Sequence, residues 1–340
     1  MGIFSWLFGQ KSAPSNPAPA PARRPRPTTE LKSESAYPDR ELIARLFYLH
    51  LFGARAYPLD PGSTLRPAEA DWLAARQEDL KRTPTQLTQL VPRLPAVLPR
   101  LMTALNDTDT PIRHLTELIE SDPIIAAQVL RLINSPAMRV RREDITSLEQ
   151  AVLLLGFAGM REVVSAAMFS PIGKLNLVAG VHPLLIHDIW PISLRAANAL
   201  RMGLKSKAAP ADAPEGGEAF DLYLSVLIEH TGLIALVRQQ PLTGSALTPA
   251  YLDAVRRLVP AYSARIAEAW ALSPRAIDLI RNPDPVLDGY RQNARYFATA
   301  CALNRRGFLD PAQLLHLCRD LPPYASEWHD TCVSHPQDTK

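Results

Sequence analysis

The chain has 340 residues, of which 47% are hydrophobic and 21% are charged, so it carries enough apolar material to bury a sizeable core. Its formal net charge of +3 comes from residues 1–30, because basic and acidic residues balance over the rest of the sequence. Phosphate contacts dominate affinity for nucleic acids, and a neutral body therefore argues against nucleic-acid binding.

The N-terminus combines an apolar tip with a proline-rich stretch. Phe4, Trp6 and Phe8 form the tip, and residues 10–36 are rich in Pro, Ala and Ser. Such a composition cannot offset the entropy of ordering, so residues 1–36 are expected to form a disordered tail. The tip is either a frayed terminus or a segment that docks on a partner or touches the inner membrane peripherally, and the cost of exposing aromatic side chains is the argument for docking.

The sequence predicts a cytoplasmic location. No signal peptide is recognisable, and no apolar run reaches the roughly 20 residues that span a bilayer. Cys301, Cys318 and Cys332 are an odd number of cysteines without CxxC spacing, which predicts free thiols in a reducing compartment.

Two helices are expected in residues 37–85. The first runs from Asp39 to Phe52 with its leucines on one stripe and ends before Gly53. The second follows Pro67 and continues to about Lys81. Together they form an N-terminal extension that should pack on the main module.

Residues 86–285 read as a series of capped helices. Thirty-two prolines against fifteen glycines suggest many short helices that start and stop at prolines. After a helix over 112–120, Asp122 is a good N-cap and Pro123 a good first residue for the next helix, which ends at Asn134. The sequence from Ser147 to Gln150 predicts a capping box, and Gly156 a left-handed stop before a helix over 158–168.

The second half of the chain continues the same pattern. A helix over 186–202 should bury Trp190, and residues 220–237 form one helix or a helix pair that contains His230. No run of period two is present, so the fold is expected to be all-α. Further helices are expected over residues 249–258, 262–272, 274–280, 288–305 and 311–319, the last two in a C-terminal region of helices and tail over 286–340.

The order of these features resembles the HDOD family of bacterial regulatory modules, which are related to the HD-domain metal phosphohydrolases. The resemblance covers about residues 86–285 and implies a multi-helix HDOD or HD-like bundle. It rests on Asp122–Pro123, Leu130–Ser135, Ile145–Val152, Leu155–Gly156, Met160–Val163, Trp190 with Ser193 and Ala197, and Leu227–Gly232.

The resemblance raises the question of catalysis. An active HD enzyme holds a divalent metal with a histidine, a His-Asp doublet and a later aspartate, whereas the doublet position here reads His230–Thr231. The histidine expected soon after Trp190 is replaced by Pro191, Ile192 and Ser193. We therefore expect no catalytic residue, no metal and no cofactor, and interpret His230 as a hydrogen-bonded core or pocket histidine.

Three other groups of residues have open interpretations. His182, His187 and Asp188 could suggest a metal site, but the spacing of the two histidines does not place both on one helix face. Asn134 and Ser135 should bond to helix-end carbonyls or turn amides, and they also border a candidate ligand or partner surface. That surface includes Arg139, Arg141 and Arg142, either as a solvated connector or as a docking site for an acidic partner or a phosphate, while Arg256 and Arg257 are expected on a solvated helix face.

The sequence thus predicts a non-catalytic signal-transduction module. It would bind a signalling protein, or a small ligand such as a nucleotide through the former catalytic cleft, with His230 in the candidate site. The alternative is a divergent metal-dependent HD-type phosphohydrolase that acts on nucleotides.

Overall fold

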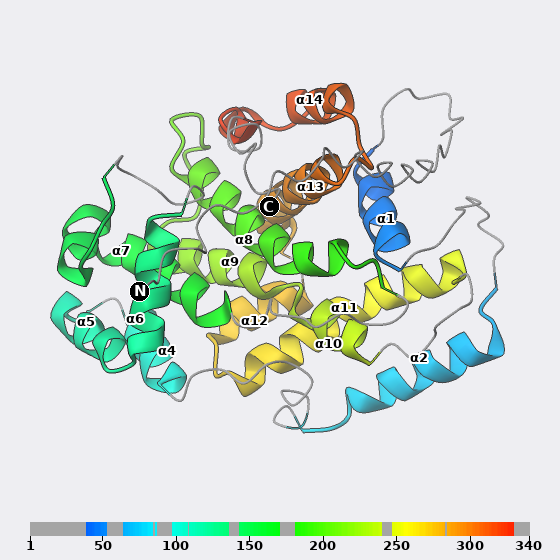
Figure 1. Cartoon of the computed structure of the whole chain (residues 1–340), viewed down its shortest axis with the longest axis horizontal. Coiled ribbons are helices and arrows are strands. Elements are labelled where there is room, and N and C mark those ends of the chain that lie inside the picture. The colour runs from blue at the N-terminus through cyan, green and yellow to red at the C-terminus, as the bar shows by residue number, and fades with distance from the viewer. Residues whose placement is uncertain are drawn as a thin grey trace, which may run out of the picture. The chain divides into compact units, whose positions relative to one another are not determined.

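The computed structural model describes residues 39–52, 64–83, 86, 97–107, 109–135, 143–170, 181–239, 247–282 and 284–329. In these ranges all regular structure is helical, which confirms the predicted all-α class (Figure 1). They belong to one compact unit that extends from Ser35 to the end of the chain. The predicted tail with Phe4, Trp6 and Phe8 lies outside the described residues.

Prolines and capping side chains begin the helices, as the sequence predicts. Asp122 accepts hydrogen bonds from the amides of Ile124 and Ile125 at 2.9 and 3.2 Å. A missing amide costs nothing at the first helical position, where it would have no partner. Helices that start with proline are α2 (Pro67–Asp79), α6 (Pro123–Ile133), α11 (Pro249–Ala269), α12 (Pro274–Arg281), α13 (Pro285–Arg305) and α14 (Pro311–Arg319).

Two prolines depart from that rule and lie inside helices. Pro191 lies in α8 (Leu185–Leu204) and Pro260 in α11. The predicted break between residues 258 and 262 is therefore wrong, and α11 is one long helix. Its residues on both sides of Pro260 are buried against neighbouring helices, and this packing outweighs the lost hydrogen bond.

The first part of the module contains α4 (Leu98–Asn106), α5 (Ile112–Glu120), α6 and α7 (Leu148–Phe169), which pack in sequence order. Helix α4 was not predicted. Gly156 interrupts α7 with φ +64° and ψ −175°, so the helix breaks at the predicted residue, but this ψ lies outside the left-handed helical conformation that was expected. Only half of the capping box forms: Ser147 accepts from the Gln150 amide, whereas Gln150 Oε1 accepts from Thr146.

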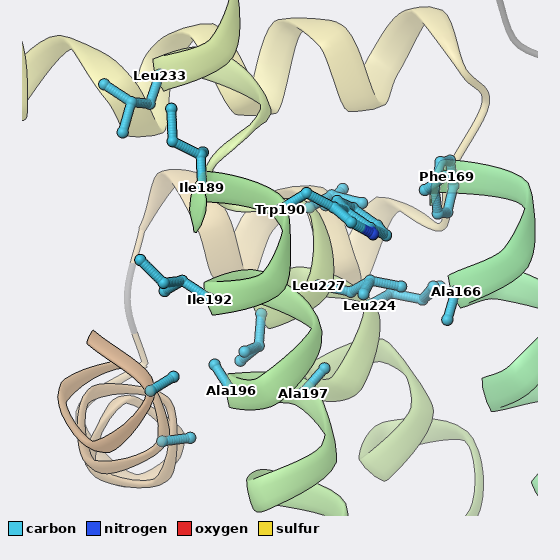
Figure 2. Close-up of a cluster of buried hydrophobic side chains, with 14 of the residues drawn as sticks. Ala166, Phe169, Ile189, Trp190, Ile192, Ala196, Ala197, Leu224, Leu227 and Leu233 are labelled. Atoms are coloured by element: carbon cyan, nitrogen blue, oxygen red, sulfur yellow. The ribbon is translucent and has the colours of Figure 1, made fainter. Parts of the chain in front are cut away.

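Helix α8 runs through the core of the module. It packs on α9 (Gly216–Ile228) and on α13, and α9 also contacts α7. Trp190 is buried, as predicted, and Figure 2 shows it between Phe169 of α7 and the leucines of α9. On another face of α8, Ile189 points toward Leu233 of α10 (Thr231–Arg238).

The N-terminal extension packs on this core, as predicted. Helix α1 (Arg40–Leu51) contacts α8, α11 and α13, and the Leu51 carbonyl accepts from the His182 amide at 2.6 Å. Helix α2 packs on α11, where buried Glu69 accepts from the backbone amide and the hydroxyl of Thr248 at 2.9 and 2.7 Å. Trp72 donates to the Gln239 carbonyl at 3.1 Å. These bonds join segments more than 160 residues apart in sequence.

Two observations differ from expectation. The segments 148–169 and 216–238 are long and apolar enough to cross a membrane, although 56% and 94% of their apolar windows are buried among other helices, as in core helices of helical domains. Cys301 is disulfide-bonded, so the prediction of three free thiols is wrong; Cys318 is free.

Candidate functional site

The site begins at the break between α9 and α10. Glu229 ends the first helix and His230 precedes the second, and both side chains are buried. The Thr231 hydroxyl donates to the Ile228 carbonyl at 2.8 Å, so its only proton serves the backbone of the break. The predicted helix pair therefore turns at the residues that correspond to the His-Asp doublet.

A close approach of α10 to α11 fixes the position of this turn. The Gly232 amide donates to Ser263 Oγ at 2.9 Å, and the same hydroxyl donates to the Glu229 carbonyl at 2.5 Å. A β-carbon at Gly232 would lie only 2.3 Å from the Val259 carbonyl oxygen. Glycine is required here because no side chain fits between the two backbones.

His230 is paired with Ser193, one of three residues of α8 at the place where the resemblance led us to expect a histidine. Ser193 Oγ lies 2.9 Å from His230 Nδ1, a hydrogen bond whose direction depends on the tautomer of the imidazole. Burial is the main cause that lowers the pKa of His230, so the ring is neutral near pH 7. The prediction of a hydrogen-bonded pocket histidine is confirmed.

Two arginines of α13 hold the neighbouring Glu229, which is 6% exposed. Arg291 Nη2 donates to Glu229 Oε2 at 3.3 Å, and Arg295 Nη1 lies 3.7 Å from Oε1. Burial acts to raise the pKa of Glu229, but the charges of Arg295 and Arg291 prevail and keep it below the usual value. Arg291 is also buried and donates to the Leu279 carbonyl, so α13 is attached to the turn and to α12.

A cavity of about 420 Å³ opens above this cluster. His230 and Glu229 contribute to its wall from the turn, and the other walls come from α1, α11, the end of α12 and α13. On the α1 side, Glu41 accepts from both terminal nitrogens of Arg256 at 2.7 and 2.9 Å. Arg256 thus lies in an ion pair at the cavity wall rather than on a purely solvated face.

The remaining predicted residues fall into two groups. Asn134 and Ser135 have structural roles. The Asn134 side chain donates to the Ile145 carbonyl and accepts from the Ile145 amide, both at 2.8 Å. The Ser135 hydroxyl donates to the Leu132 carbonyl. Neither residue lines the cavity around His230. Arg139, Arg141 and Arg142 lie outside the described residues, and their role in a surface stays a prediction.

The histidine cluster near residue 182 does not converge on one point. His182 Nδ1 accepts from the amides of Leu184 and Leu185 at the start of α8. The Asp188 carboxylate accepts two hydrogen bonds from Arg306, at 2.6 and 3.1 Å. These contacts are those of a helix start and a structural ion pair.

Sequence reasoning missed Glu229, Arg291 and Arg295. Glu229 stands beside the histidine that was singled out, and the two arginines are spaced four residues apart on one helix. That spacing places both guanidinium groups on one face, which was the available signal. Their common partner lies about 60 residues away and could not be read from local pattern.

Comparison with known proteins agrees with this architecture. The HDOD domain model matches residues 91–284, more than half of the chain. The chain belongs to the HDOD family. A search of curated proteins finds no match.

Solved structures share the fold of this HDOD protein at low sequence identity. A protein of Shewanella amazonensis SB2B, provisionally named a metal-dependent phosphohydrolase, is 18% identical with a TM-score of 0.53, covering 79% of this chain and 99% of its own. A second protein of that organism, provisionally named a phosphohydrolase, is 19% identical with a TM-score of 0.51, covering 76% and 94%. An HDOD domain protein of unknown function from Geobacter sulfurreducens is 19% identical with a TM-score of 0.50, covering 78% and 95%.

The residues at the HD position of this HDOD domain do not fit a divalent metal. Metal centres of HD enzymes need converging imidazole and carboxylate ligands. Here Thr231 offers no carboxylate, His230 bonds to Ser193 through one ring nitrogen, and the nearest carboxylate is compensated by Arg291 and Arg295. Guanidinium groups beside the carboxylate already supply the positive charge that a metal would bring.

The contact of α10 with α11 yields a prediction. Gly232→Ala should lower the free energy of unfolding by about 1–3 kcal/mol or more, because the new methyl group overlaps the Val259 carbonyl. Urea unfolding followed by circular dichroism measures the change. Gly289→Ala in α13 is the matched control: its methyl group meets open space, and it should stabilise by up to about 1 kcal/mol. Equal stability of the two variants would contradict the close approach.

Proposed function

We propose that this HDOD protein is a non-catalytic signal-transduction module that acts by binding a partner or a small ligand. The observation that carries the proposal is that the polar side chains at the HD position already have partners within the protein. Thr231 bonds to the backbone, His230 bonds to Ser193, and Glu229 is paired with arginines. Each of these groups serves the fold at a place where related enzymes would present metal ligands.

The chemistry of phosphate-ester hydrolysis supports a non-catalytic role. Hydrolysis of a phosphate ester by an HD enzyme requires a metal that lowers the pKa of a bound water. A neutral imidazole can act as a base without a metal, but His230 is buried and its Nδ1 is engaged by Ser193. In this proposal the cavity serves as a binding site, and its polar groups bind a ligand without catalysing a reaction.

The alternative function is a divergent metal-dependent phosphohydrolase that acts on nucleotides. It is favoured by the provisional names of the two Shewanella amazonensis proteins with the same fold. Fold likeness at this level of identity does not transfer an activity. The two functions differ in a direct test of metal content and turnover.

The proposed function predicts that the protein neither holds a metal nor catalyses hydrolysis. The full chain, purified without chelators, should contain far less than one manganese, iron or zinc ion per chain, and it should not hydrolyse nucleotides or phosphate monoesters when these metals are added. Elemental analysis and a phosphate-release assay measure both. The His230→Ala variant, checked for folding by circular dichroism, is the control. Stoichiometric metal together with turnover, both lost in His230→Ala, would establish the phosphohydrolase instead.

The N-terminal tip is proposed to hold the module at the inner surface of the cytoplasmic membrane. Its support is the sequence: Phe4, Trp6 and Phe8 can insert at an interface, and Arg23, Arg24 and Arg26 follow on a proline-rich stretch. Apolar insertion and attraction to anionic lipid act together in such segments. The tip would then raise the local concentration of the folded module near its partners.

This proposal predicts binding of the full chain to vesicles that contain anionic lipid. Replacing Phe4, Trp6 and Phe8 together by serine should weaken co-sedimentation at least about tenfold, because burial of three aromatic side chains is lost. Leu153→Ser is the control, since Leu153 is an exposed apolar side chain of the folded unit. Equal co-sedimentation of the triple variant and the unaltered chain would contradict the proposed membrane contact.

A further inference from the structure

The cavity above His230 has walls that the HDOD core alone does not supply. The family match ends at residue 284, whereas α1 precedes it and α13 follows it. Arg40 and Tyr48 of α1 and Arg295 and Tyr296 of α13 line the cavity together. The volume of about 420 Å³ lies within the range of sites for small molecules. Helices outside the family match therefore complete the cavity over the HD position.

Positive charge exceeds negative charge around the cavity. The charged lining residues are two glutamates, Glu41 and Glu229, and four arginines, Arg40, Arg256, Arg291 and Arg295. Glu41 pairs with Arg256, and Glu229 is shared between Arg291 and the more distant Arg295. Four arginines therefore face two carboxylates, and the excess positive charge is most accessible on Arg40 and Arg295, the two with exposed side chains.

Arg40 and Arg295 both have donors to spare. Arg295 lies 3.7 Å from Glu229, too far for a hydrogen bond, and its side chain is 46% exposed. The Arg40 guanidinium lies over the ring of Tyr296 at 5.7 Å from its centroid and forms no hydrogen bond with the described residues. Guanidinium groups with free donors in a concave site are suited to phosphate oxygens.

The charges act on a common point in the cavity. Tyr48 lines it, and burial raises the pKa of its hydroxyl, while the charges of Arg295 and Arg256 lower it and that of Glu229 raises it. Charged groups from the turn between α9 and α10, from α11 and from α13 are therefore within electrostatic reach of one hydroxyl on α1. A ligand anion in the cavity would experience the same field.

One acceptor complements these donors. Glu229 Oε1 is buried and has no hydrogen-bond partner in the described part of the chain. An ionised carboxylate oxygen in this state is costly unless it receives a hydrogen bond. A hydroxyl or amine group on a bound molecule can donate to it, so the ligand should carry a donor as well as an anion.

We infer that this cavity binds a small phosphate monoester whose phosphate contacts Arg295 and Arg40 and whose hydroxyl group donates to Glu229. The inference rests on the proposed function, because it assigns a ligand class to a site that binds without turnover. Bound phosphate would join α1 to α13, since Arg40 and Arg295 lie on those two helices. Ligand binding would thereby stabilise the N-terminal extension against the core.

The test is calorimetric titration of the full chain with ribose 5-phosphate at constant ionic strength. Ribose 5-phosphate should bind and raise the melting temperature, whereas ribose, which lacks the phosphate, should do neither. Inorganic phosphate should bind more weakly, because it lacks the sugar hydroxyls. Absence of binding by ribose 5-phosphate, or equal binding of ribose, would overturn the inference.

Variants locate the site. Arg295→Gln and Arg40→Gln should each weaken binding of ribose 5-phosphate by about tenfold or more, the loss expected for one charge-assisted contact. Both side chains lie at the surface end of the cavity, so the variants should fold, which a melting curve verifies. Arg113→Gln on α5, a nearly fully exposed arginine outside the cavity, is the control and should leave affinity unchanged. Unchanged affinity in both cavity variants would place the ligand elsewhere and refute the assignment.

Failure of this inference can be separated from failure of the proposed function. Metal-dependent release of phosphate from ribose 5-phosphate would refute the proposed function and the inference that depends on it. A chain that neither hydrolyses nor binds the ester refutes the ligand class alone, and the module then acts through a different partner.

Discussion

The ion pair between Glu229 and Arg291 is the interaction on which the site depends. Both side chains are buried, and a charge removed from water is tolerated only with a close partner of opposite sign. The pair connects the turn between α9 and α10 to the middle of α13, a helix that also packs on α8 and α1. Removing either partner would leave the other buried charge with only a more distant partner, Arg295 at 3.7 Å from Glu229 or Asp288 at 3.7 Å from Arg291. The position of α13 over the turn is therefore constrained.

The same interaction explains how the residues at the HD position are held together in this structure. In related enzymes a divalent ion supplies positive charge that draws carboxylates and imidazoles together. Here guanidinium groups of α13 supply that charge, and Ser193 holds the imidazole of His230. Helix α1 closes the remaining side through the ion pair of Glu41 with Arg256. The result is a defined cavity with surplus positive charge.

Sequence reasoning predicted the features that depend on neighbouring residues. The cap at Asp122, the prolines that begin helices and the interruption of the helix at Gly156 follow from local backbone chemistry. Features decided by distant contacts were missed. The break expected at Pro260 is absent because packing on both sides holds α11 together. Glu229 and Arg291 are separated by 62 positions, and no local pattern pairs them. The prolines around residues 92–99 obscured the start of α4 at Leu98.

The claim that the buried pair of Glu229 and Arg291 holds the site together is tested most directly by a double-mutant cycle. The stabilities of the unaltered chain, Glu229→Gln, Arg291→Met and the double variant would be measured by urea unfolding. We predict that each single substitution costs about 3–5 kcal/mol and that the double variant costs much less than their sum, with a coupling of at least about 1 kcal/mol. Single costs that add within about 0.5 kcal/mol would show that the two side chains do not depend on each other and would contradict the account.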